Sequence, residues 1–352
     1  MKLTDGIKMV KPGDAQAAEK AKERWDQVAK PLGSLGVLEE DIVRIAAASQ
    51  NPQPLLSPRT IAVMCSDNGI VEEGVTQTGQ EVTAVVAGNM GVGNSCVCLM
   101  ARQCRAEVIP VDVGMVCRET PKGVLSRKVC FGTKNFLKEP AMTREETVKA
   151  MEAGMDTAFS LKDQGFHLVG SGEMGIGNTT TSSAVISVLL GIDPQKVTGR
   201  GAGLSSQGLS RKVEVIRQGI RIRRPDREDP IDVLSKVGGA DLAALAGFYI
   251  GCGACRLPAV LDGLITGAAA LAAVRLCPPV ADYLLASHVT AEPAGAMVLK
   301  ELGLHPAIQA GMCLGEGTGA AALFPLLDMA AAVYCQMSTF EGIRVEAYQP
   351  LE

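Results

Sequence analysis

The sequence predicts an α/β protein of three layers, in which helices cover both faces of a mainly parallel β-sheet. Short apolar runs alternate with helical stretches from residue 60 onward. Each run ends in polar or glycine residues, as Thr60–Cys65 does at Ser66–Gly69. Hydrophobic residues make up 47% of the 352 residues and aromatic residues only 3%, so small side chains must fill the core. Such residues suit helices that pack closely on a parallel sheet.

The amino-terminal part predicts two helices between Ala15 and Ala48. A turn with both proline and glycine, Lys30–Gly36, separates them, and a proline-rich linker follows at 51–58. The expected strands come after this linker. They are Thr60–Cys65, Glu107–Asp112, His167–Gly170, Val260–Ile265, Tyr283–Ala286 and Ala310–Leu314.

Helical patterns are found at Ser182–Leu190 and Ala321–Val333. The longest apolar stretch, Ala259–Val274, is broken by Asp262 and several glycines, so it predicts a strand followed by a helix and not a membrane span. In a parallel sheet, ligands bind beyond the carboxyl ends of the strands. The loops that follow the strands are therefore where we look for function.

Charge and composition argue against several classes of protein. The net charge is −4, whereas a duplex-binding surface is basic, so we do not expect nucleic acid as a partner. Residues 1–6 contain no apolar run of the kind that begins a secretory signal. We therefore expect a cytoplasmic protein without a membrane partner.

The eleven cysteines raise the question of a metal or disulfide site. Cys252 and Cys255 form a CxxC pair, but no second pair follows, and the three histidines are not at ligand spacing to any cysteine. We expect no metal site and reduced thiols. The sequence leaves open whether Cys252 and Cys255 have a redox role.

Glu316 is the most informative residue, because it is one acid inside the glycine-rich turn Leu314–Ala320. A carboxylate held against an apolar pocket has its charged form disfavoured, so its pKa rises toward that of a usable base. The same position also suits an acid that complements the dipole of the helix that follows. The turn alone supports both interpretations.

A second glycine-rich stretch, Gly170–Thr181, joins an expected strand to an expected helix. Glycines let the backbone approach an anion, and the free amides of a helix start can hold a phosphate. The spacing matches neither the dinucleotide fingerprint nor the P-loop. It favours a single phosphate, as in a mononucleotide, over a tight turn without a ligand.

Other strand ends carry weaker signals. Arg200 or Lys212, in or near the cluster Gly199–Gly203, could neutralise the same phosphate. Asp67 is placed to shape its own turn as well as to act chemically. A lone histidine such as His288 is more often structural than catalytic.

Together these segments resemble the CobT-type nicotinate-nucleotide–dimethylbenzimidazole phosphoribosyltransferase family. The resemblance runs in order from about residue 20 to about residue 335. The matching pieces are Lys30–Gly36, Asp67–Gly69, Gly172–Thr180, Gly199–Gly203, Gly238 and Gly239 with Asp241, Val260–Gly263, Ser287 and His288 with Glu292, and Leu314–Ala320.

The resemblance implies that phosphoribose moves from nicotinate mononucleotide to an aromatic base, which later becomes the lower ligand of a cobamide. It implies a large Rossmann-like α/β domain at 60–315, a small helical domain made from 1–59 with 316–352, and a homodimer. A heterodimer with a homologue is also possible. Nicotinate mononucleotide is then a substrate, and no cofactor or metal is expected.

The resemblance also assigns roles to residues. Glu316 falls on the general-base position. The phosphate and ribose would be held by Glu173, Gly175, Ile176, Gly177, Asn178, Thr179, Gly201 and Lys212. The incoming base would lie against Thr76, Thr83, Val85 and Leu314.

The chain departs from the family pattern where the base should bind. Gly79 replaces a proline and Val85 a glutamine, and Glu292–Gly295 lacks the usual final histidine. Losing an amide removes a polar contact with the incoming ring. The acceptor could therefore be dimethylbenzimidazole, a purine or a phenol. The change also allows a non-catalytic partner subunit, and a nucleotide-binding sensor is a third hypothesis.

Overall fold

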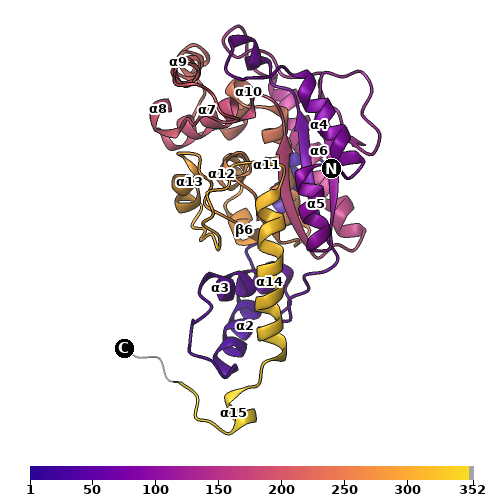
Figure 1. Cartoon of the computed structure of the whole chain (residues 1–352), viewed down its shortest axis with the longest axis vertical. Helices are drawn as coiled ribbons and strands as arrows, with labels where there is room; N and C mark the ends of the chain where they lie inside the picture. Colours follow the sequence, from indigo (N-terminus) through magenta and orange to yellow (C-terminus); the bar gives the residue numbers. More distant parts are fainter. Residues whose placement is uncertain (349–352) are drawn as a thin grey trace.

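The computed structural model describes residues 1–348. Six parallel strands form one sheet in the order β3-β2-β1-β4-β5-β6 (Figure 1). Their bounds are β1 Arg59–Ser66, β2 Ala106–Gly114, β3 Leu125–Ser126, β4 Leu168–Met174, β5 Ala259–Leu261 and β6 Leu284–Ala286. The strand order reverses between β1 and β4, which is where open α/β sheets bind ligands. The predicted parallel α/β fold is confirmed.

Strand β1 shows why the sheet needs helices on both faces. All eight of its residues are buried, and its side chains alternate between two hydrophobic clusters. Ala62 and Met64 pack with α6 (Arg144–Asp163), α7 (Asn178–Leu190), α11 (Ala240–Ala254) and α12 (Leu264–Leu276). Ile61 and Val63 pack with α4 (Glu81–Gly91), α5 (Cys96–Gln103) and α14 (Thr318–Gln336). This is the three-layer arrangement predicted from the continuous apolar runs.

The remaining helices lie around these layers. They are α1 Leu3–Met9, α2 Ala15–Gln27, α3 Val37–Ser49, η1 Gly69–Glu73, α8 Pro194–Val197, α9 Ser206–Arg223, α10 Pro230–Val237, η2 Pro278–Tyr283, α13 Gly295–Glu301 and α15 Phe340–Ile343. The two amino-terminal helices predicted between Ala15 and Ala48 are α2 and α3.

Two strand predictions were wrong. The stretch expected at Val260–Ile265 is a strand only to Leu261, because α12 already begins at Leu264. The stretch expected at Ala310–Leu314 forms no strand, and the nearby backbone makes only an isolated bridge between His288 and Ile308. Four of the five residues of Ala310–Leu314 are exposed, so this run packs no apolar face on the sheet, and a short apolar run alone does not distinguish a strand from a loop.

A cluster of helices lies at one end of the sheet. Trp25 of α2 packs edge-on against Tyr334 of α14 with ring centroids 5.0 Å apart, and Ile42 of α3 joins the same apolar cluster. Helix α1 lies elsewhere, because Leu3 is part of the cluster that contains α6 and α11. The domain boundaries 1–59, 60–315 and 316–352 stay a prediction.

Helix α14 joins this helical cluster to the sheet (Figure 1). Its first half contributes Ala320 and Phe324 to the cluster that covers β1, and its second half contributes Ala330 and Tyr334 to the cluster with α2 and α3. Packing of both halves of α14 therefore fixes the position of the turn that precedes Thr318.

Two stretches, Glu81–Gln103 and Thr318–Gln336, are long and apolar enough to cross a membrane by length and composition alone. The first contains α4, α5 and the break between them, and the second is α14. Half of the apolar window of α14 is buried. Because core helices pass the same test, these stretches are weak evidence for a membrane.

Helices α6 and α11 approach each other so closely that glycine is required at the contact. A Cβ atom at Gly154 would overlap the carbonyl oxygen of Ala244, and one at Gly247 would overlap that of Met151. We predict that Gly154→Ala lowers the free energy of unfolding by about 1–3 kcal/mol, because backbone must move. The matched control is Gly88→Ala in α4, where the new Cβ would lie 3.4 Å from Pro121 Cβ.

Urea denaturation of the two variants and the wild type measures this difference. The control should be neutral or slightly stabilising, since alanine favours a helix. Equal stability of Gly154→Ala and Gly88→Ala would contradict the close contact.

Candidate active site

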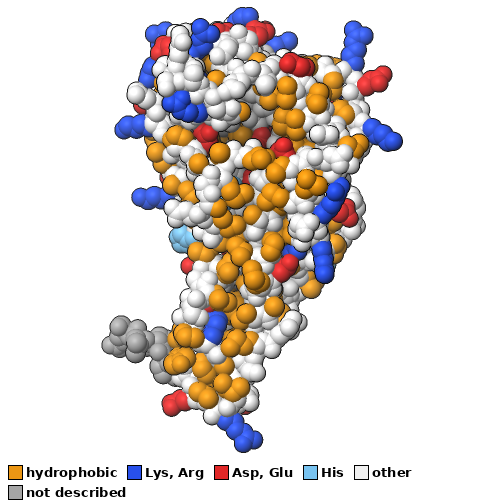
Figure 2. Space-filling view, in the orientation of Figure 1, with side chains coloured by type: hydrophobic (Ala, Val, Ile, Leu, Met, Phe, Trp, Pro, Cys, Tyr) orange, Lys and Arg blue, Asp and Glu red, His pale blue; other side chains and the backbone are white. Residues whose placement is uncertain are grey.

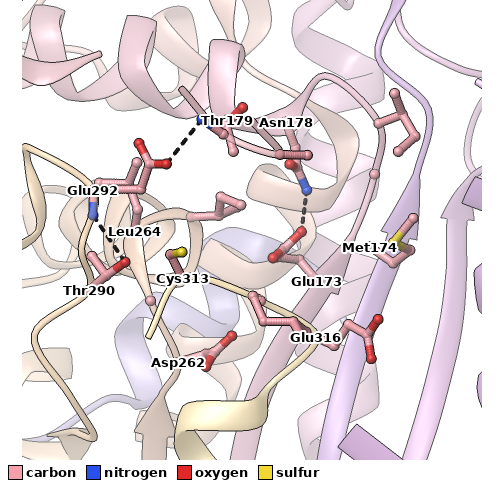
Figure 3. A pocket seen from close by; sticks show the side chains of 18 of the residues that line it. Glu173, Met174, Asn178, Thr179, Asp262, Leu264, Thr290, Glu292, Cys313 and Glu316 are labelled. Carbon is pink, nitrogen blue, oxygen red and sulfur yellow. Dashed lines mark hydrogen bonds between the residues drawn. The ribbon is translucent and has the colours of Figure 1, made fainter. Parts of the chain in front are cut away.

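A cavity of about 240 Å³ lies beyond the carboxyl ends of β4, β5 and β6. Glu173 and Met174 come from β4, Asp262 follows β5, and His288 follows β6. The turns that precede α7 and α14 close two further sides (Figure 3). The side chains that matter below are Glu173, Asn178, Asp262, His288, Glu292 and Glu316. Five of these six carry or can carry a charge.

Asp262 fixes the turn that carries Glu316. One of its carboxylate oxygens accepts a hydrogen bond from the amide of Gly317 at 3.0 Å, and the other accepts from the amide of Gly319 at 2.6 Å. The Asp262 side chain therefore serves the start of α14 as a cap. Burial raises the pKa of Asp262, whereas these amides lower it. Two donated hydrogen bonds need two acceptor oxygens, which favours the carboxylate.

Glu316 has left-handed backbone geometry, with a φ of 61°, which is uncommon for a residue with a side chain. Its carboxylate turns away from its own helix and accepts a hydrogen bond from the amide of Val97 at 3.3 Å. Val97 lies in the first turn of α5, whose N-cap is Ser95. The acid therefore complements the start of α5, while Asp262 caps α14.

The environment of Glu316 also fits a base. Burial raises the pKa of its carboxyl, although the Val97 amide and Ser95 lower it. The side chain is part of the cavity wall and lies near Met174 (Figure 3). The hydrogen bonds from Val97 and Ser95 lower the pKa of Glu316 by less than burial raises it, so its carboxylate is more basic than that of an exposed glutamate. The sequence suggested that Glu316 could complement the helix that follows it; the structure shows instead that Glu316 accepts from the first turn of α5, while Asp262 accepts from the start of α14.

Glu173 is a buried carboxyl of different character. Burial raises its pKa well above the ordinary value, and the nearby Asp241 and Asp262 raise it further. The side-chain amide of Asn178 donates a hydrogen bond to it (Figure 3). Burial and the neighbouring carboxylates thus shift Glu173 toward its protonated form, in which it can donate as well as accept a hydrogen bond.

The glycine-rich turn Gly175–Gly177 lies directly on the end of β1. A Cβ at Gly175 would collide with the backbone oxygen of Ser66 and lie 2.7 Å from the Asp241 carboxylate, so only glycine fits. The amide of Ile176 donates to the hydroxyl of Thr83 at 3.1 Å. This hydrogen bond to Thr83 therefore holds the turn in place.

Lys212 is fully buried beside this turn. Its ammonium group donates to the Thr179 hydroxyl at 2.8 Å and to the Gly199 carbonyl at 3.3 Å. Burial lowers the pKa of Lys212 to about 8, while Glu292 acts in the opposite direction. A buried cation beside backbone amides is a suitable place for an anion. We call Thr179, Gly199, Gly201 and Lys212 the anion cradle.

The structure brings most of the predicted site residues together. Glu173, Gly175, Ile176, Asn178, Thr179, Gly201, Leu314 and Glu316 all line the cavity. Gly177 and Lys212 line an adjoining hollow of about 90 Å³, as does Thr76. Thr83 is buried beneath the turn, and Val85 is 68% exposed on α4. Thr76 and Val85 therefore do not face the Glu316 side of the cavity in this conformation.

Three carboxyl or imidazole side chains of the cavity were missing from the set predicted for the site. Asp262, His288 and Glu292 each lie in a segment that follows a strand of the sheet. Their position after a strand could have identified them from the sequence, because the carboxyl ends of neighbouring parallel strands meet at one edge of the sheet. His288 Nδ1 lies 3.0 Å from the Ser287 hydroxyl, and burial lowers its pKa.

Cys313 is the one cysteine among the residues that line the cavity. All eleven are free thiols, and burial raises the pKa of Cys255 to about 12. In residues 1–348, no three His, Cys, Asp or Glu side chains gather as a metal-binding group.

The sheet and cavity are those of an α/β enzyme whose site places carboxyl groups beside a buried lysine and backbone amides suited to an anion. A family model described as phosphoribosyltransferase matches residues 10–345. The chain belongs to this phosphoribosyltransferase family. It is 44% identical, over the whole length of both chains, to a nicotinate-nucleotide–dimethylbenzimidazole phosphoribosyltransferase of Ruminiclostridium cellulolyticum.

Two further similar proteins support membership of the same family. A protein of the same name from Acetivibrio thermocellus is 45% identical over 93% of each chain. The crystal structure of CobT from Thermus thermophilus has a TM-score of 0.89 and 38% identity, and covers 94% of this chain and 99% of that chain. The fold and the family predicted from the sequence are confirmed.

The role of Asp262 leads to a prediction about stability. In Asp262→Asn one oxygen becomes an NH2 group that faces a backbone amide, which leaves a buried donor unpaired. We expect the free energy of unfolding to fall by about 1–3 kcal/mol. Hydrogen exchange of the Gly317 and Gly319 amides should become faster than in the wild type.

The control is Asp26→Asn, which removes a carboxylate from an exposed position on α2. It should change neither measurement. Unchanged exchange at Gly317 and Gly319 in Asp262→Asn would show that Asp262 does not hold the Glu316 turn.

Proposed function

We propose that the chain transfers phosphoribose from nicotinate mononucleotide to 5,6-dimethylbenzimidazole or a related base. The products are α-ribazole 5′-phosphate and nicotinate, as needed to assemble the nucleotide loop of a cobamide. The single observation that carries the proposal is one cavity whose wall holds Thr179 and Gly201 of the anion cradle together with Glu316, with Lys212 in the hollow that adjoins it. The names of the full-length relatives support the substrates.

The reaction needs one nucleophile, one leaving group and one base. A ring nitrogen of the benzimidazole attacks C1′ of the ribose with inversion, while the bond from C1′ to nicotinate breaks. Its electron pair returns to the pyridinium nitrogen, so nicotinate leaves without being protonated. The second ring nitrogen of the acceptor loses its proton to Glu316.

The remaining residues position the donor. The 5′-phosphate lies in the anion cradle, where Lys212 supplies charge and Gly201 an amide. Glu173 meets the ribose hydroxyls, and its raised pKa lets it donate a hydrogen bond to one of them. Fixing the sugar in line with the acceptor removes much of the entropic barrier.

The acceptor that we propose first is dimethylbenzimidazole, because the curated relatives carry its name. Purines and phenols are the alternatives. A phenol would attack through oxygen and depends even more on Glu316, since its own hydroxyl proton must leave. Leu314 is the predicted base-binding residue that lies beside Glu316 on the cavity wall.

We also propose a cytoplasmic homodimer that needs no cofactor or metal. Figure 2 shows hydrophobic side chains gathered along the face that α14 presents. Val92, Leu99 and Met329 are each more than half exposed near or on α4, α5 and α14. Exposed apolar patches of this kind mark association surfaces. A heterodimer with a homologue would use the same face.

The test of the function is to incubate the purified chain alone with nicotinate mononucleotide and one acceptor at a time. The acceptors are dimethylbenzimidazole, adenine and phenol, and chromatography follows nicotinate release. Turnover with dimethylbenzimidazole supports the proposal. No turnover with any acceptor would favour the non-catalytic subunit or the sensor, which the named relatives do not favour.

Glu316→Gln tests the base. The variant keeps the shape of the side chain and an acceptor for the Val97 amide but cannot take a proton. We predict a fall in kcat of roughly 100- to 10,000-fold, with the KM for nicotinate mononucleotide almost unchanged. Steady-state kinetics measure both. A variant that keeps a tenth of the wild-type kcat would rule out Glu316 as the base.

The pH dependence of kcat/KM for nicotinate mononucleotide should be bell-shaped. Glu316 must be ionised, so activity falls as pH drops through its pKa, which burial holds above the usual glutamate value of about 4.3. Lys212 must be protonated, so activity also falls as pH rises through about 8.

The variants separate the two limbs of this profile. Glu316→Gln should lose the acidic limb, and Lys212→Met should lose the alkaline limb. An alkaline limb that persists in Lys212→Met would show that another group titrates there.

A further inference from the structure

The carboxylate of Glu292 reaches into the anion cradle. Its Oε1 accepts a hydrogen bond from the amide of Gly201 at 3.1 Å, which is one of the donors of the anion cradle (Figure 3). It comes from the loop between β6 and α13, far in sequence from the rest of the cradle. Nothing in the proposed reaction uses this carboxylate.

The contacts of Glu292 are those of an anion. Its Oε2 is buried and has no hydrogen-bond partner in the described part of the chain. A Cβ at Gly199 would overlap Oε2, so the carboxylate lies directly on the Gly199–Gly201 backbone. Glu292 also stabilises the charge on Lys212. One carboxylate thus accepts from the Gly201 amide and acts electrostatically on the Lys212 cation, the two groups that a phosphate would need.

We infer that Glu292 is a placeholder for the phosphate and that the donor must displace it from the anion cradle. The inference rests on the proposed function only in taking the donor anion to be a phosphate. Before the donor binds, the carboxylate satisfies Gly201 and balances the buried charge of Lys212. A phosphate brings more charge and more acceptor oxygens, so it can take over the hydrogen bond from Gly201 and also balance the charge of Lys212.

This arrangement makes Glu292 a specificity-determining residue. A ligand without a phosphate gains nothing by displacing the carboxylate, because the cradle is already occupied. A phosphate must overcome both the Glu292 contact and the repulsion between two anions. The cost is electrostatic, so removing the charge while keeping the hydrogen-bond acceptor should strengthen phosphate binding.

Glu292→Gln provides the test, because its amide oxygen can still accept from Gly201. Isothermal titration with inorganic phosphate, at pH 6.5 to keep Lys212 protonated, should give a dissociation constant roughly 3- to 30-fold lower than that of the wild type. The KM for nicotinate mononucleotide should fall by a similar factor. Phosphate that binds equally well or more weakly would overturn the inference and show that Glu292 holds the loop in shape.

The matched control is Glu301→Gln, which makes the same charge change on α13, where Glu301 pairs with Arg275 at the surface. It should bind phosphate as the wild type does. An equal gain in this control would also overturn the inference, because net charge would then explain it. Phosphate titration needs no turnover, so its outcome is independent of the acceptor experiment.

Discussion

The two hydrogen bonds from Gly317 and Gly319 to the Asp262 carboxylate are the constraint on which the candidate site depends. Asp262 follows a buried strand, whereas the two amides begin a helix that packs on that sheet. The pair locks the start of α14 to β5. Glu316, directly before Gly317, is thereby held in a left-handed conformation with its side chain turned toward α5.

The site separates charge between its two sides. Glu173, Asp262 and Glu316 gather at the strand ends, where burial raises the pKa of each. Lys212 lies in the hollow that adjoins the cavity, buried and with a lowered pKa. An acidic side suits proton transfer, and a cationic side suits a phosphate. One substrate that reaches from one side to the other uses both.

The full-length relatives establish which phosphoribosyltransferase family the chain belongs to. The geometry of the cavity shows how side chains of this chain could hold a substrate and transfer a proton. Where the chain departs from the family pattern, at Gly79 and Val85, the structure places Val85 on the exposed face of α4 and not in the cavity.

The sequence by itself determined the parallel α/β fold, because buried strands that alternate with helices leave few other arrangements. It also identified the glycine-rich turns and Glu316, since their local patterns carry their own signal. Only the tertiary structure decided that Asp262 holds the Glu316 turn and that Glu292 reaches the anion cradle. Those contacts join residues more than fifty positions apart, and no local pattern encodes such a distance.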